Sequence, residues 1–103
     1  MARKKAPLFA PPSPGQVLRD HILGGERITQ DALADAMGVS RLTVNQLIND
    51  KRTITAEMAL RLARVLRTTP DFWLDLQRQV DLFEARKALA AELEKMPVLR
   101  TAA

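Results

Sequence analysis

The stretch from residue 29 to residue 52 constrains the fold of this chain more than any other part of it. It contains two short segments with helical apolar spacing, and Gly38 lies between them. Glycine ends a helix readily because it adopts the left-handed backbone conformation without a Cβ clash. Thr29 and Ser40 precede the two segments, and their hydroxyls are favourable N-caps. The stretch therefore predicts two helices joined by a tight turn. The apolar residues expected to pack between them are Leu33, Ala34, Met37, Val39, Val44 and Leu47.

The second of these segments leaves a hydrogen-bonding face free. At 3.6 residues per turn, Arg41, Asn45 and Asn49 share its outer side. Arg can donate two hydrogen bonds to guanine, and Asn or Gln can do the same work on adenine. A face that is merely solvated tends to carry Glu and Lys pairs instead, so this face is typical of a helix that reads DNA. The residues expected to contact bases are Ser40, Arg41, Leu42, Asn45 and Gln46.

The rest of the chain predicts an all-α domain of five helices with a long C-terminal helix. Runs of alternating β-branched residues are missing, and Ser13, Thr55 and Thr69 supply further N-caps. With 103 residues, the chain has room for one domain. We expect that domain over residues 13–95, after a flexible basic, proline-rich arm over 1–12 and before a frayed tail over 96–103.

The net charge of +4 is a mild indication of a polyanionic partner. The charge is unevenly spread, because residues 29–52 carry three basic and three acidic side chains. Positive charge therefore flanks the expected reading helix, as it would if the flanks hold phosphates. The arm, with Arg3, Lys4 and Lys5, is either a solvated terminus or a basic segment that lies along DNA.

The final helix carries a stripe of large apolar residues that exceeds the needs of a small core. Two interpretations are open: part of the stripe forms a dimer interface, or all of it wraps the core. We expect the first. The predicted interface residues are Phe72, Trp73, Leu76, Val80 and Phe83.

Several functional classes are disfavoured. The chain has no cysteine and one histidine, His21, and it lacks a glycine-rich phosphate loop and a metal-ligand cluster. We therefore expect no enzyme activity, no cofactor and no metal. No apolar run is long enough for a membrane span, so we expect a cytoplasmic protein that is nucleoid-associated when bound to DNA.

The pattern resembles the XRE-type (phage-repressor) helix-turn-helix, with Gln30 at its head, Ala34 inside and Gly38 at the turn. The flanking segments narrow this resemblance to the HigA (VapI-like) antitoxin family. They are PGQVLRDHIL before the motif, and NDKRTITAEMALRLARVL and TTPDFWLDLQRQVDL after it.

This resemblance implies a five-helix antitoxin that dimerises on a palindromic operator, represses its own operon and neutralises a HigB-type toxin, similar to RelE ribonucleases that cut mRNA. Two departures, Leu42 at a usually polar position and Asp50 where glycine is common, bear on base preference and on the turn. Two candidate toxin-binding surfaces are residues 7–25 and the acidic outer side of the last helix, with Asp75, Asp81 and Glu84, because a ribonuclease toxin is expected to be basic. The residues expected to hold DNA phosphates are Thr29, Gln30, Thr43, Asn49, Lys51 and Arg52.

Two alternatives remain. A stand-alone XRE-type transcriptional regulator would share the DNA chemistry and have no toxin partner. An inhibitor that acts by protein contact alone would have lost DNA binding.

Overall fold

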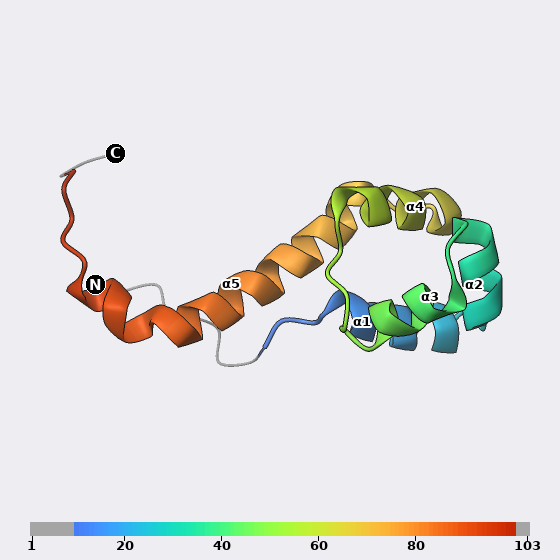
Figure 1. Ribbon diagram of the computed structural model, residues 1–103, viewed down its shortest axis with the longest axis horizontal. Coiled ribbons are helices and arrows are strands. Elements are labelled where there is room, and N and C mark those ends of the chain that lie inside the picture. The colour runs from blue at the N-terminus through green and yellow to red at the C-terminus, as the bar shows by residue number, and fades with distance from the viewer. Residues whose placement is uncertain (1–9, 101–103) are drawn as a thin grey trace.

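The computed structural model describes residues 10–100, and these residues form helices joined by short turns, with no strand among them. Residues 1–9 of the predicted arm and 101–103 of the predicted tail lie outside the described residues. The all-α class and the long C-terminal helix are confirmed (Figure 1). The helices are α1 (Pro14–Val17), continued directly by the π-helix η1 (Leu18–Gly24), then α2 (Gln30–Met37), α3 (Arg41–Ile48), α4 (Ala56–Leu66) and α5 (Pro70–Lys95).

The predicted N-caps start the helices. In each case a Ser or Thr hydroxyl accepts a hydrogen bond of 3.0–3.2 Å from the backbone N–H three residues later. Proline occupies the first turn of α1 and of α5, where its missing N–H costs nothing. Local sequence signals therefore determine where these helices begin. The capping residues are Ser13, Thr29, Ser40, Thr55 and Thr69.

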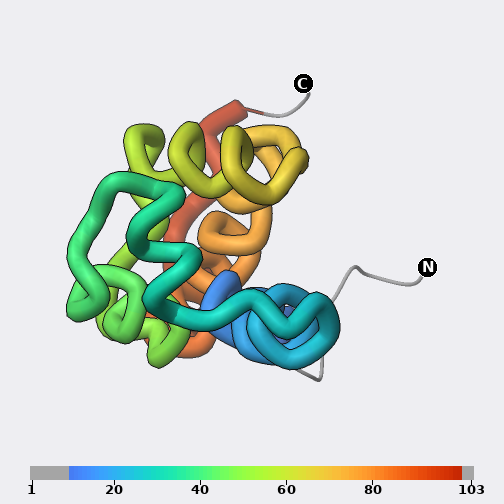
Figure 2. The backbone as a smooth tube through the Cα atoms, turned by 90° about the vertical axis from the view of Figure 1, so that its right-hand side faces the viewer, coloured from blue at the N-terminus to red at the C-terminus, as the bar shows by residue number. Residues whose placement is uncertain are grey.

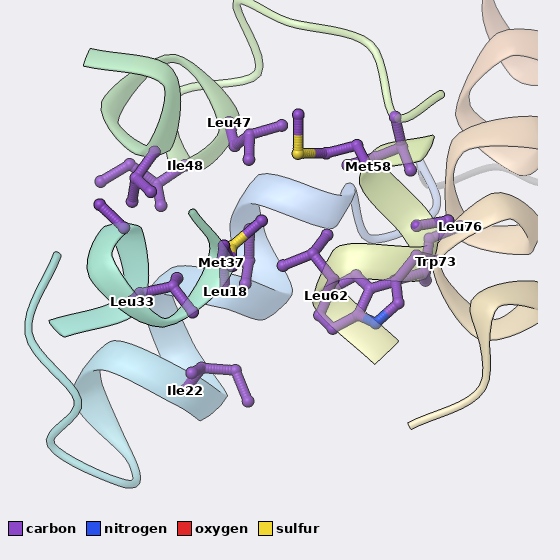
Figure 3. Close-up of a cluster of buried hydrophobic side chains, with 14 residues drawn as sticks. Leu18, Ile22, Leu33, Met37, Leu47, Ile48, Met58, Leu62, Trp73 and Leu76 are labelled. Atoms are coloured by element: carbon purple, nitrogen blue, oxygen red, sulfur yellow. The ribbon is translucent and has the colours of Figure 1, made fainter. Parts of the chain in front are cut away.

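Within residues 10–100, α1 and η1 form one continuous helical segment, which together with α2, α3, α4 and α5 encloses one hydrophobic core. Figure 1 shows α4 opposite α1 and α3, with α2 closing the end of the helical body. Trp73, Leu18 and Leu62 are completely buried and lie near the centre, where side chains from α4, α5 and η1 meet (Figure 3). The indole N–H of Trp73 is satisfied by the hydroxyl of Thr68 at 2.7 Å. The core thus fixes the start of α5 against the helix-turn-helix half of the body.

The C-terminal part of α5 projects from this body (Figure 1). With 26 residues, α5 is about 39 Å long. Its buried residues, Trp73 and Leu76, both lie in its first two turns, so only the start of the helix covers the core. The radius of gyration is 17.2 Å, whereas a compact domain of this length would have about 13 Å. Seen from the end of the body, the rest of α5 recedes behind the other helices (Figure 2). Among residues 10–100, no helix is both long enough and apolar enough to cross a membrane.

The burial of α5 corrects part of the predicted dimer interface. Trp73 is 0% exposed and Leu76 is 9% exposed within a single chain, so neither side chain is available to a partner. The prediction of these two as interface residues is wrong, because the first turns of α5 pack into the chain's own core. Phe72 is exposed at 42%, while Val80 and Phe83 are half-buried.

Candidate DNA-binding interface

Helices α2 and α3 meet at a sharp turn around Gly38. This residue has φ 72°, a conformation that favours glycine, and its N–H caps the end of α2. The guanidinium of Arg61, from α4, donates a 2.7 Å hydrogen bond to the carbonyl of Met37 in the last turn of α2. The carbonyl end of α2 is thereby bound to α4, and the angle between α2 and α3 is braced from outside the motif.

One face of α3 packs inward and the other is open. Val44, Leu47 and Ile48 are buried against the core, as their spacing predicted. Leu42 is 65% exposed, which leaves an apolar side chain free on the outer surface. Four of the five predicted base-reading residues lie on α3, and the fifth, Ser40, is its N-cap. Ser40, Arg41, Leu42 and Asn45 are exposed, and Gln46 is half-buried.

Arg41 pairs with an acid from the preceding helix. Its Nη1 lies 3.4 Å from the carboxylate of Asp31, and both side chains are mostly exposed. An exposed pair at this distance contributes little to stability. The pair holds the flexible guanidinium of Arg41 near the surface of the motif. Because the pair is weak, DNA can replace Asp31 as the partner of Arg41 at a small cost in free energy.

Hydrogen bonds also order the C-terminal half of this face. The amide of Asn49 donates to the backbone carbonyl of Asn45 at 2.9 Å, which turns the Asn49 side chain back onto α3. Arg52 donates from Nε and Nη2 to the Oε1 of Gln46, at 3.0 and 2.8 Å. These contacts fix polar side chains that would otherwise move freely on an exposed surface.

The predicted phosphate-binding residues lie at the start of α2, in the first turn of α3 and just beyond the end of α3. The hydroxyl of Thr29 caps α2, and that of Thr43 is 3.0 Å from the hydroxyl of Ser40. Gln30 is half-buried at the start of α2, and its Oε1 has no hydrogen-bond partner among the described residues. Both N-termini, of α2 and α3, carry backbone N–H groups suited to an anion. The cationic members of the set, Lys51 and Arg52, are exposed beyond the other end of α3.

The turn after α3 contains an interaction that sequence reasoning missed. Asp50 adopts φ 55°, so the residue that replaces the common glycine keeps a left-handed conformation. Its carboxylate accepts hydrogen bonds from the hydroxyl of Ser13 at 2.7 Å and from the N–H of Gly15 at 3.1 Å. The departure from glycine at position 50 was the one signal in the sequence that pointed here.

The first helical segment closes over the end of α3. Arg19 donates to the carbonyl of Ile48, which has no partner within α3. A Cβ at Gly15 would lie 2.8 Å from the carbonyl oxygens of Leu47 and Ile48, so the backbones can approach this closely only at glycine. The end of the candidate reading helix is therefore held by a segment 29 to 35 positions away in the sequence.

These features define a class of protein: a helix-turn-helix with an open polar second helix that is suited to the major groove of DNA. The helix-turn-helix family model matches residues 26–73. Antitoxin HigA-1 of Vibrio cholerae is 45% identical over 82 residues, which cover 80% of this chain and 77% of that protein.

Solved structures agree with this relationship. The Pseudomonas aeruginosa antitoxin HigA, solved with the higBA promoter, has a TM-score of 0.80 and 37% identity, and the match covers 87% of this chain and 99% of that one. The antitoxin GraA in complex with its operator has a TM-score of 0.82 and 36% identity, with 99% and 100% covered. The chain belongs to the HigA antitoxin family, and its helix-turn-helix is of the DNA-binding XRE type.

Proposed function

We propose that this chain is an antitoxin that binds operator DNA as a homodimer, represses its own toxin–antitoxin operon, and neutralises a HigB-type, RelE-like, mRNA-cleaving toxin. The observation that carries the DNA part is the open face of α3, which is polar, ordered and braced at both ends. The net charge of this face is small, so the affinity for DNA depends on Lys51, Arg52 and the N-termini of α2 and α3. Arg41 and Asn45 discriminate between bases.

The dimer follows from the geometry of such motifs on DNA. Two recognition helices in successive major grooves lie about 34 Å apart on a palindromic site. A single chain presents one such helix, α3. A second copy is therefore needed to occupy both halves of an operator.

A second apolar stripe on α5 is our candidate for the dimer surface. It lies on roughly the opposite side of the helix from Trp73 and Leu76, by the 3.6-residue period. Spacings of seven and four residues give it the heptad pattern of helices that pair. At its base it adjoins an apolar groove lined by Ile54, Leu74 and Ala85. The stripe consists of Leu82, Leu89 and Leu93, which are 41%, 42% and 48% exposed, and the exposed C-cap residue Met96 follows the end of the helix.

The acidic side chains of α5 do not single out a toxin-binding surface, although the sequence indicated that they could. Each of the three acids expected to attract a basic toxin already has a neighbour on α5. Asp75 pairs with Arg78 at 3.0 Å, and Glu84 lies 3.8 Å from Lys87. Asp81 accepts from Gln77 at 3.0 Å. We therefore propose only that the toxin binds away from the DNA-reading face, so that the two activities are separable.

One experiment tests both activities. The product of the gene adjacent to this one is induced with and without this chain, and growth and co-purification are scored. In parallel, this chain is titrated onto DNA from upstream of its own gene. We expect growth rescue, co-purification, and binding to the upstream DNA.

The variant Arg41→Ala separates the two parts. It should lose affinity for the upstream DNA and keep the growth rescue, because its side chain is on the DNA-reading face. DNA binding without rescue or co-purification would contradict the antitoxin proposal and favour a stand-alone regulator. Rescue without any binding to the upstream DNA would contradict autorepression.

A further inference from the structure

Gln46 and Arg52 form a chelated pair on the DNA-reading face. The Nε and Nη2 of Arg52 both donate to the Oε1 of Gln46, at 3.0 and 2.8 Å. A guanidinium has donors and no acceptor, so the amide group of Gln46 must turn its oxygen toward Arg52. The orientation of the amide is thus set by its neighbour's chemistry.

The pairing changes what Gln46 can offer to a base. An amide oxygen has two lone pairs, and two N–H groups of Arg52 occupy them. The remaining functional atom, Nε2, carries two donors and accepts nothing. Gln46 therefore presents a donor-only group, although a free glutamine would present one donor and one acceptor.

The backbone keeps the pair together. The N–H of Lys51 donates to the carbonyl of Gln46 at 2.8 Å, and the left-handed turn at Asp50 brings the chain back over the end of α3. Arg52 is exposed, and its Nη1 is not used in the pair. That atom remains able to meet a DNA phosphate, which would hold the guanidinium in place when DNA is bound.

Base edges in the major groove differ in the groups they present. Adenine shows the N7 acceptor beside the N6 donor, and a glutamine reads it through one donor and one acceptor. Guanine shows the N7 and O6 acceptors, and thymine shows the O4 acceptor. A donor-only amide matches the acceptors of guanine and thymine, and it fails to make the paired contact with adenine.

We propose that Gln46 reads an acceptor-only base edge, of guanine or thymine, and that Arg52 is the positioning residue that determines this preference. The inference rests on the proposed DNA binding, and it reverses the adenine preference that glutamine alone would suggest.

The test is selection from a library of duplexes with a randomised half-site, using the full chain. Gln46→Ala identifies the base pair that Gln46 contacts, because preference at that position alone is lost. At that position we expect the wild-type chain to favour guanine or thymine over adenine about tenfold. The base recovered tells which of the two is read, and 7-deazaguanine in its place checks the role of N7.

Arg52→Ala then frees the amide oxygen. We expect the discrimination against adenine at the Gln46 position to fall about tenfold, with preferences elsewhere unchanged. Arg52→Lys keeps the charge and lacks the fork of two donors, so overall affinity should be retained while discrimination falls. Arg64→Ala, which removes an exposed charge from α4, is the control and should change no preference.

Three results would overturn the inference. The wild-type chain could favour adenine at the Gln46 position, Gln46→Ala could leave every preference unchanged, or Arg52→Ala could weaken all sequences equally. If the wild-type chain selects no sequence at all, the proposed DNA binding fails and the inference with it. Selection with an adenine preference overturns the inference alone.

Discussion

The carboxylate of Asp50 accepts a 2.7 Å hydrogen bond from the hydroxyl of Ser13, which joins the turn after the reading helix to the first residue of the helical body. The same carboxylate accepts from the N–H of Gly15, while the hydroxyl of Ser13 caps α1. The carboxylate of Asp50, at the end of α3, therefore binds two residues at the start of α1. It makes the direction of α3 depend on α1, which lies outside the helix-turn-helix itself.

Substitutions at Asp50 separate the two roles of this residue. Asp50→Ala loses both hydrogen bonds and places a Cβ residue without a local polar contact at φ 55°. We expect it to lower the free energy of unfolding by about 1–3 kcal/mol. Asp50→Gly loses the bonds but relieves the backbone strain at this left-handed position. Its free energy of unfolding in urea should therefore lie between those of Asp50→Ala and the wild type. An Asp50→Ala variant as stable as the wild type would show that the bonds to Ser13 and Gly15 contribute nothing.

The contact between α1 and α3 has no room for a side chain at Gly15. The Cβ of Gly15→Ala would lie 2.7 Å from the Oδ1 of Asp50 and 2.8 Å from two backbone oxygens. We expect a loss of about 1–3 kcal/mol of stability, because backbone has to move. Gln16→Ala, at the exposed next position, is the matched control and should melt near the wild type. Equal melting temperatures for both variants would refute the close approach.

Features set by neighbouring residues were predictable from the sequence, and features set by distant ones were not. The five hydroxyl caps, the turn at Gly38 and the inward face of α3 depend on spacing within one or two turns, and all are as predicted. The pairs Asp50–Ser13 and Arg61–Met37 join residues that only the folded chain brings together.

The stripe on α5 shows the same limit. Apolar spacing predicted a stripe from Phe72 to Phe83 on one helix, but it did not show where along that helix the body of the domain ends. Trp73 is completely buried in the core, whereas Leu89, further along the same helix, is 42% exposed. The roles assigned to the residues of α3 stay predictions, because their base contacts depend on DNA.

The buried indole of Trp73 predicts a stability effect rather than an interface effect. Trp73→Ala removes a fully buried side chain and its 2.7 Å bond to Thr68. We expect a loss of about 3–5 kcal/mol in urea unfolding. Phe72→Ala, which alters the ring packed edge-to-face on the indole at 5.0 Å, should cost less because Phe72 is 42% exposed. A Trp73→Ala variant with wild-type stability would contradict the placement of the indole.

The exposed stripe on α5 predicts where association can be broken without unfolding. Leu89→Asp places a charge in the proposed seam, so the mass in solution should fall from that of two chains to that of one. Helix content and melting of the monomer should change little, since Leu89 is 42% exposed and is not a member of the buried core. Leu60→Asp, at a 59% exposed position on α4, is the control and should leave the mass unchanged. A dimer that survives Leu89→Asp would place the interface elsewhere.

The most direct measurement of whether α3 reads bases is the affinity of the wild type and of Arg41→Ala for upstream DNA and for a scrambled duplex of equal length, at one salt concentration. Within residues 10–100, Arg41 is held by an exposed pair to Asp31, so DNA can recruit its guanidinium. We expect Arg41→Ala to cost about 1–3 kcal/mol on the upstream DNA, to relax preference at one base pair, and to have a smaller effect on the scrambled duplex. Equal losses on both duplexes would contradict base reading and show that Arg41 holds a phosphate.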